Sequence, residues 1–160
     1  MYLIWCFSGS HIRKDPIETD VFQARCIGEG MKRLGVNKFS VFGTSYGGYV
    51  AYRMADIYPE EVEKEVILSC GICCTVEQKA EETKKIGKDI AEILVTQRPE
   101  DLRFLMNRVL YRPPYWVPEF LLQDFINVMC MAHRREKMET MYHLLHAKAN
   151  LKPPILNQYI

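Results

Sequence analysis

Apolar and polar residues alternate along the first half of the chain in blocks that predict three strands. The opening MYLIWCFSGS, residues 1–10, is a continuous apolar run that ends in small residues, as a buried parallel strand does before a turn. Residues 11–20 are polar and contain a proline, so we expect a loop there. KFSVFG (38–43) and residues 66–69 predict the second and third strands.

Two helices are expected between these strands. Residues 21–34 carry apolar or small side chains at helical spacing, with Asp20 as the predicted N-cap and Gly35 as the C-cap. The residues that form this stripe are Val21, Ala24, Ile27, Met31 and Leu34. GGYVAYRMADIY (47–58) predicts the second helix, which Pro59 ends. Because strands and helices alternate, we expect an α/β fold with a parallel sheet and helices on its faces.

The second half of the chain has a helical pattern and contains no convincing strand. VEQKAEETKKIGKDIAEILV (76–95) reads as a charged amphipathic helix, and residues 98–110 as a second helix with Pro99 in its first turn. YRPPYWVP (111–118) is expected to be a rigid loop, followed by one long helix or two over residues 119–148. The pattern therefore separates an α/β segment over residues 1–74 from a helical block over 75–150, which a last short segment at 151–160 follows.

Composition excludes several classes of protein. The chain has 160 residues, of which 48% are hydrophobic and 26% charged, as in an ordinary soluble domain. A formal net charge of +1 gives no reason to expect a nucleic acid or an anionic membrane as partner.

No apolar run approaches the length of a membrane span. Six cysteines without the spacing of a disulfide framework indicate a reducing compartment, so we expect a cytoplasmic protein.

The sequence GTSYGG contains a candidate nucleophile at the corner between the second strand and its helix. A sharp strand-to-helix turn forces its tip residue, Ser45, into a strained conformation with φ above zero and requires small neighbours at Gly43, Gly47 and Gly48. Such a turn exposes the serine hydroxyl at the start of a helix. The backbone N–H of Tyr46 is then expected to point toward the oxyanion that forms when Ser45 attacks a carbonyl.

Two other interpretations of this corner stay open. It can be a plain tight turn, or it can cradle a phosphate at the start of the helix. GTSYGG matches neither of the glycine patterns typical of nucleotide-binding loops, which disfavours the phosphate cradle.

Residues 39–71, FSVFGTSYGGYVAYRMADIYPEEVEKEVILSCG, closely resemble the elbow, following helix and next strand of the α/β-hydrolase fold family. The similarity is greatest to a plant subset that is related to bacterial C–C bond hydrolases and to lipase- or esterase-like serine hydrolases. Residues 21–41 are similar to the helix and strand before the elbow, and residues 102–126 to the family's helical cap. Residues 1–10 are similar to the preceding strand, although the family usually has an Asp-led run there.

The resemblance implies a hydrolase in which Ser45 attacks an acyl carbonyl and the resulting acyl-serine is hydrolysed by water. A serine at this position favours esters, lactones, thioesters or C–C bonds next to a ketone, so the implied partner is a small acyl or ketone substrate, with no cofactor. Of the family's catalytic triad, only Ser45 has a counterpart; the acid and the base are expected to be absent from these residues. The resemblance also implies a partial core over residues 1–74, a helical cap over 75–150 and the start of the next core segment at 151–160. We therefore expect a central fragment of the fold that is weakly active or inactive and that associates through exposed sheet edges. The alternative is a non-catalytic remnant or a small-ligand-binding module.

The histidines are weak substitutes for the missing base. His11 lies in the polar loop after the first strand, whereas His133, His143 and His146 fall in the predicted helical block and are expected to be surface or packing residues. His143 and His146 have a spacing that suits a metal, but no carboxylate or thiol pattern accompanies them. Asp56 is expected to be a solvated or capping acid.

The sequence SCGICC contains a C-x-x-C pair, Cys70 and Cys73. With Cys130 and His133 it would give four zinc ligands, and after a strand it also resembles a redox motif. A redox motif should open a helix at its first cysteine, whereas the next helix is expected only after Thr75. We therefore expect reduced, space-filling cysteines and no metal site, with the zinc and redox interpretations less favoured.

Overall fold

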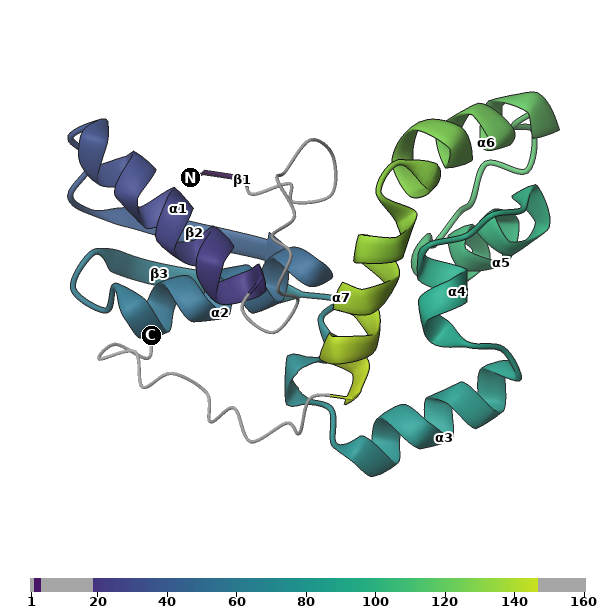
Figure 1. Ribbon diagram of the computed structural model, residues 1–160, viewed down its shortest axis with the longest axis horizontal. Helices are drawn as coiled ribbons and strands as arrows, with labels where there is room; N and C mark the ends of the chain where they lie inside the picture. The colour runs from purple at the N-terminus through teal and green to yellow at the C-terminus, as the bar shows by residue number, and fades with distance from the viewer. Residues whose placement is uncertain (1, 4–18, 147–160) are drawn as a thin grey trace. The chain divides into compact units, whose positions relative to one another are not determined.

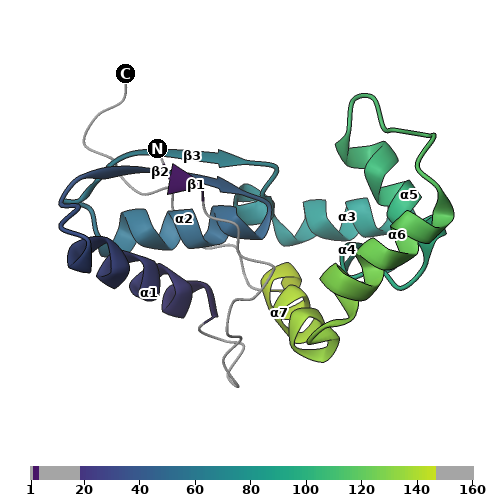
Figure 2. The ribbon, with the colours of Figure 1, turned by 90° about the horizontal axis from the view of Figure 1, so that it is seen from above.

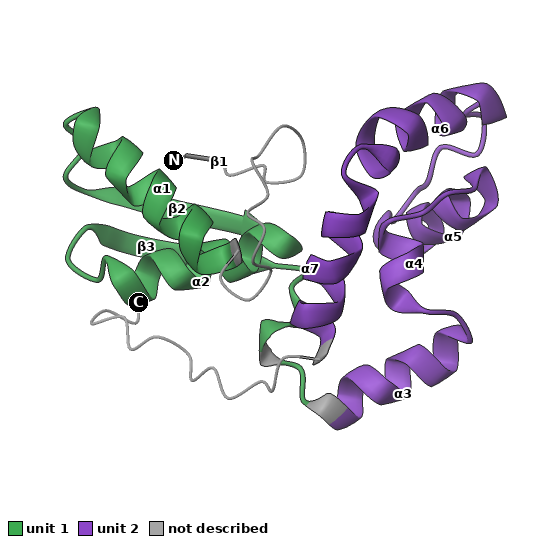
Figure 3. Ribbon diagram, in the orientation of Figure 1, with its two compact units in different colours: residues 1–75, 148–160 green, residues 76–147 purple. Residues whose placement is uncertain are grey.

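The computed structural model describes residues 2–3 and 19–146 (Figure 1). The chain divides into two compact units, coloured separately in Figure 3. The described residues of unit 1 are 2–3 and 19–75, and those of unit 2 are 76–146. Most of the opening strand, the polar loop with His11, and residues 147–160 lie outside the described residues.

Unit 1 is built on a parallel sheet. Its strands are β1 (Tyr2–Leu3), β2 (Phe39–Thr44) and β3 (Val62–Leu68), in the order β1-β2-β3. Val41 of β2 lies opposite Tyr2 on one side and Glu65 on the other. The parallel α/β arrangement predicted from the sequence is confirmed for these strands. The predicted start of the third strand was wrong, because pairing begins at Val62 and the strand includes three consecutive charged residues, Glu63, Lys64 and Glu65.

Two helices pack on the same face of this sheet, α1 (Thr19–Arg33) and α2 (Tyr46–Ile57), as Figure 2 shows. The buried side chains between helices and sheet include Ala24, Met31, Val41, Val50, Ala51 and Met54. Gly35, with φ +71, ends α1 as predicted. Val36 N–H closes that turn by donating to Met31 O at 3.0 Å.

Two details of α1 differ from the prediction. Asp20 does not cap the helix, because α1 begins at Thr19 and the Asp20 carboxylate instead accepts a 2.9 Å bond from Arg53 Nε of α2. Leu34 does not join the buried stripe: it lies in the turn after the helix and is 76% exposed.

Unit 2 contains helices and no strand among its described residues. Its elements are α3 (Val76–Ile86), α4 (Ile90–Leu94), α5 (Pro99–Val109), α6 (Glu119–Ile126), the π-helical segment η3 (Asn127–Met131) and α7 (Arg134–His146). The single helix predicted over 76–95 was wrong. Gly87 ends the first part with φ +67, and Asp89 starts the second by accepting a 2.8 Å bond from Ala91 N–H.

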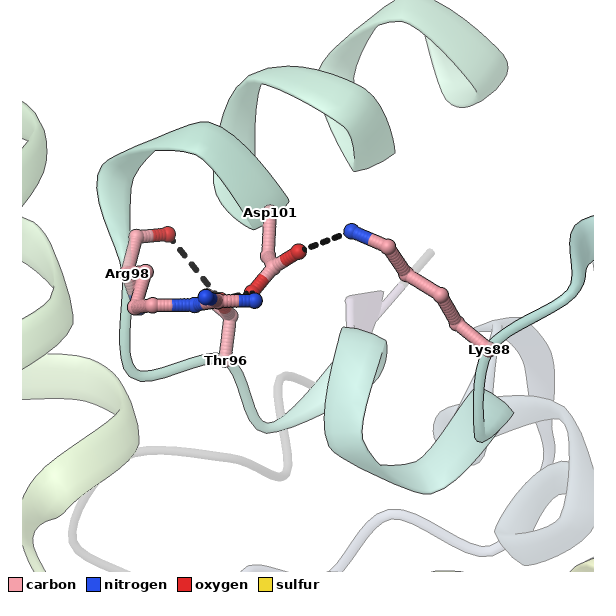
Figure 4. A network of polar contacts seen from close by, with 4 residues as sticks. All are labelled: Lys88, Thr96, Arg98 and Asp101. Atoms are coloured by element: carbon pink, nitrogen blue, oxygen red, sulfur yellow. Dashed lines mark hydrogen bonds and ion pairs between the residues drawn. The ribbon is translucent and has the colours of Figure 1, made fainter.

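A polar network fixes the start of α5 (Figure 4). Asp101 accepts from Lys88 Nζ at 2.6 Å and from Arg98 Nε at 3.0 Å, and its side chain is 13% exposed. Thr96 Oγ1 donates to Arg98 O at 3.1 Å. The pKa of Asp101 is lowered, first by the Lys88 hydrogen bond and then by Arg98. The network therefore stabilises the turn between α4 and α5 only while Asp101 is ionised.

Candidate active site

Ser45 stands between the end of β2 and the start of α2. Its backbone has φ 52 and ψ −123, a region that L-residues other than glycine adopt only at a cost of about 1–3 kcal/mol. Ser45 N–H donates to Leu68 O of β3 at 3.0 Å, and Gly48 N–H donates back to Ser45 O at 3.0 Å. The strained strand-to-helix turn predicted from the sequence is therefore present, and its geometry is held from both sides.

The serine side chain is exposed, whereas the first turn of α2 behind it is buried at Tyr46, Gly47 and Gly48. Ser45 occupies the N-cap position, but its hydroxyl makes no capping hydrogen bond. The positive end of the α2 dipole lies at this position and would stabilise negative charge that develops beside Ser45.

The glycines around Ser45 allow close approach of the backbone. A Cβ at Gly43 would collide with the carbonyl group of Gly47 and lie 2.8 Å from Ala51 Cβ. A Cβ at Gly48 would lie 2.7 Å from Cys70 Sγ and 2.9 Å from Ile67 Cγ2. Larger residues at either place would push α2 away from the strand ends.

Sequence reasoning missed a second strained serine beside the first. Ser69 is exposed and has φ 50, and it directly follows Leu68, the last residue of β3, whose carbonyl accepts from Ser45 N–H. Ligands of open parallel sheets bind at the carboxyl ends of the strands, where both serines lie. An S-C-G sequence after an apolar strand was the available signal for this turn.

None of the four histidines is placed beside Ser45 within the described residues of unit 1. His11 lies outside the described residues. His133 (φ 54) joins η3 to α7, and His143 and His146 lie on α7, all in unit 2. Asp56, on α2, is exposed, in agreement with a solvated acid.

The cysteines form no metal site in the described part of the chain, where no group of three or more His, Cys, Asp or Glu residues could hold an ion. The helix expected after Thr75 is confirmed, since α3 begins at Val76, although a single 3₁₀ turn, η2 (Gly71–Cys73), begins directly after Cys70. Cys70 and Cys74 are half-buried, so the expectation of fully buried cysteines in this cluster is not met at these two positions; elsewhere, Cys26 is exposed and Cys130 is buried. Burial raises the pKa of the Cys130 thiol.

Glu65 is a partly buried acid in the middle of β3. Burial raises its pKa to about 7, and its Oε1 has no hydrogen-bond partner among the described residues. It shares a strand face with Ile67, which packs on Gly48 of α2. Glu65 therefore lies on the helix-covered side of the sheet.

Unit 2 contains a cavity of about 480 Å³ between α3, α4 and α7. Tyr142 Oη donates to Asp89 Oδ2 at 2.6 Å, and this bond raises the pKa of Tyr142. Lys79 Nζ donates to Leu144 O at 3.2 Å. These polar groups join the three helices to one another, and the remaining lining is largely apolar (Ala80, Ile90 and Leu145).

Helices long and apolar enough to cross a membrane do not occur in the described ranges. No protein-family profile matches the chain. No curated protein matches it either.

A search of solved structures finds a match to the crystal structure of a probable hydrolytic enzyme from Pseudomonas aeruginosa PAO1. The match covers 94% of this chain and 46% of that one, with a TM-score of 0.51 and 20% sequence identity. The chain thus spans less than half the length of this protein. At this identity the likeness shows a shared fold, consistent with a partial α/β fold, and nothing about chemistry.

Proposed function

We propose that the chain carries the nucleophile of a serine hydrolase of the α/β-hydrolase fold, with Ser45 as that nucleophile. The single observation that carries the proposal is the backbone of Ser45, φ 52 and ψ −123, between a parallel strand and a helix. A turn with no chemical role would not require a serine in this strained conformation. Glycine could form the same turn without the steric cost.

The proposed reaction is hydrolysis of a carboxylic ester, a lactone or a C–C bond next to a ketone. Ser45 Oγ would attack the carbonyl carbon while a base takes its proton. The Tyr46 N–H and the start of α2 would stabilise the oxyanion, and its collapse would expel the leaving group to give an acyl-serine. Water would then hydrolyse the acyl-serine. In this proposal the helical unit 2 is the cap of the fold.

Residues 19–75, which surround Ser45 in unit 1, contain no histidine, so the test supplies an external base. The chain is incubated with a fluorophosphonate in the presence and absence of concentrated imidazole, and the modified residue is identified by mass spectrometry. We expect phosphonylation of Ser45 with imidazole and little without it, because an unassisted serine is a poor nucleophile.

The matched controls are two alanine variants. Ser45→Ala should abolish labelling, whereas Ser69→Ala, which removes the neighbouring strained serine, should leave the labelling of Ser45 unchanged. Failure to label Ser45 with imidazole present, or equal labelling of Ser69, would show that the turn does not activate its serine.

The second candidate function is binding of a small ligand without catalysis. The cavity of about 480 Å³ in unit 2 favours it, because it is large enough for a small molecule and mixes apolar lining with polar groups. This candidate predicts that ligands which stabilise the chain do so equally in the Ser45→Ala variant.

A further inference from the structure

The loop between α5 and α6 carries three strongly exposed aromatic side chains. Tyr111 is 94% exposed, Tyr115 77% and Trp116 80%. Val109 and Leu110, at the end of α5, are also exposed, at 65% and 44%. We call residues 109–117 the aromatic loop. Isolated exposed apolar residues are common, but here five fall within eight consecutive positions.

The aromatic loop is held in place by its own unit. Arg103 Nη2 of α5 donates to Val117 O at 2.7 Å, and Leu110 N–H continues the helix by donating to Met106 O at 2.9 Å. Pro113 and Pro114 restrict the backbone between the aromatic residues. Figure 2 shows the segment as a loop at the edge of unit 2, beyond the ends of α5 and α6. Its rings are therefore presented outward by a fixed backbone.

Basic residues accompany these rings. Residues 102–118 contain Arg103, Arg108 and Arg112 and no acid. Arg112 stacks over the Tyr111 ring at 5.5 Å, whereas Arg108 is paired with Glu82 at 3.1 Å. Asp101, the nearest acid before this stretch, is already bound to Lys88 and Arg98, which leaves exposed Glu119 as the acid next to it. Within residues 102–119, three arginines therefore accompany a single acid, although the chain as a whole is nearly neutral.

We propose that the aromatic loop docks unit 2 on an anionic phospholipid surface. Trp and Tyr rings are favoured at the headgroup level of a bilayer, where one edge is apolar and the other wet. Arg112 binds lipid phosphate through its planar guanidinium, and Val109 and Leu110 reach the acyl boundary. The excess of arginine over acid in this stretch is opposite in charge to an anionic lipid surface, which favours this occupant over a second protein. The inference rests on this surface and is independent of any role of Ser45.

The test uses the full chain with vesicles of phosphatidylcholine alone or mixed with phosphatidylserine. Trp5 and Trp116 are its two tryptophans, so a Trp5→Phe variant makes Trp116 the single reporter. We expect flotation with the phosphatidylserine vesicles, a blue shift of Trp116 emission and quenching by brominated lipid. Partitioning should fall more than about tenfold in a Tyr115→Ser/Trp116→Ser variant. It should fall about fivefold in Arg112→Gln, a difference that high salt removes.

Leu34→Ser is the matched control, because Leu34 is equally exposed, at 76%, but lies in unit 1 away from the loop sequence. It should leave partitioning unchanged. Far-UV circular dichroism and melting check that the exposed substitutions keep the fold. Absence of vesicle binding, equal binding to both lipid mixtures, or binding unchanged in the double variant would overturn the proposal. A blue shift that follows protein concentration without lipid would assign the loop to a protein interface instead.

Discussion

Gly43 decides whether the turn at Ser45 can close. A Cβ there would lie 2.7 Å from the Gly47 carbonyl carbon and 2.8 Å from Ala51 Cβ, and the Gly47 carbonyl cannot rotate away because it belongs to α2. Gly43→Ala should therefore lower the free energy of unfolding by about 2–3 kcal/mol, measured by urea denaturation.

Gly30→Ala is the control for this substitution. A Cβ at Gly30 meets nothing within 4 Å, and the residue lies inside α1. Alanine there should raise stability by up to about 1 kcal/mol, because it has the higher helix propensity. Equal effects of the two substitutions would contradict the close approach inferred at Gly43.

Glu65 should make unit 1 sensitive to pH. Its pKa is raised from 4.5 to about 7, so the folded chain holds a proton that the unfolded chain releases between these values. The contribution of Glu65 to stability is then greatest below the unfolded pKa, falls as pH rises toward 7 and is constant above it. Glu65→Gln should remove this fall and stabilise the chain at pH 8 by about 1–2 kcal/mol, after allowance for solvent screening.

The matched control is Glu63→Gln, an exposed acid on the same strand. Melting temperatures across the pH range should change for Glu65→Gln and hardly at all for Glu63→Gln. A wild-type chain whose melting temperature is flat from pH 5 to pH 8 would contradict the assigned burial of Glu65.

At the scale of elements, the start of α5 depends on Asp101. Its carboxylate lies in the first turn of the helix and accepts from Lys88 and Arg98, both more exposed than itself. Asp101→Asn should destabilise the chain by about 1–2 kcal/mol at neutral pH, because it removes the negative charge that accepts from Lys88 and Arg98. Because the pKa of Asp101 is lowered, its contribution is present above the unfolded pKa and is lost as pH falls through the folded one.

Glu100→Gln tests whether this effect belongs to the network or only to the helix dipole. Glu100 lies in the same first turn but is exposed. Chemical denaturation should show a clearly smaller loss for Glu100→Gln, and an equal loss would reduce the role of Asp101 to that of any acid at a helix start.

Helices and strands that depend on local pattern could be predicted from the sequence. The glycines around Ser45, Pro99 at the start of α5 and Gly35 after α1 all act within a few residues of themselves. The division between α3 and α4 was missed because an amphipathic pattern runs through it, although Gly87 and Asp89 are typical residues for a helix end and a helix start.

The parts that could not be predicted depend on tertiary contacts. The strained turn at Ser69 lies next to Cys70, which packs on Gly48 of a different element. Asp20 binds Arg53, 33 positions away, and so joins α1 to α2. The prediction that Asp20 caps α1 was wrong because it considered only residues close in sequence. Exposure of the aromatic loop is likewise a property of the folded unit and not of its composition.

At the scale of the whole molecule, the described helices of unit 1 leave one face of the sheet uncovered. Ile67 packs on α2, so Val66 and Leu68 project from the opposite face, where they are 46% and 49% exposed. No described helix of unit 1 covers that face, and parallel sheets are normally covered on both. We expect concentration-dependent self-association in size-exclusion chromatography with light scattering.

A Val66→Thr/Leu68→Thr variant should shift the chain toward monomer, whereas Trp116→Ser, in unit 2, should not. Monomeric behaviour of the wild-type chain at every concentration, with one cooperative melting transition, would contradict this expectation.

The central claim is that the turn at Ser45 activates a nucleophile, and a Ser45→Cys variant tests it without the need for a base. A thiol at the start of a helix, beside N–H groups that stabilise an anion, has its pKa lowered from the ordinary value of about 8.5. The measurement is the rate at which iodoacetamide alkylates the introduced thiol as a function of pH, with the site followed by mass spectrometry and a Ser69→Cys variant as control. We predict that the thiol of the Ser45→Cys variant has a pKa at least about one unit below that of the Ser69→Cys variant and is alkylated correspondingly faster at neutral pH. An introduced thiol at position 45 that titrates at the ordinary value, or at the same pH as the thiol of the control variant, would contradict the claim.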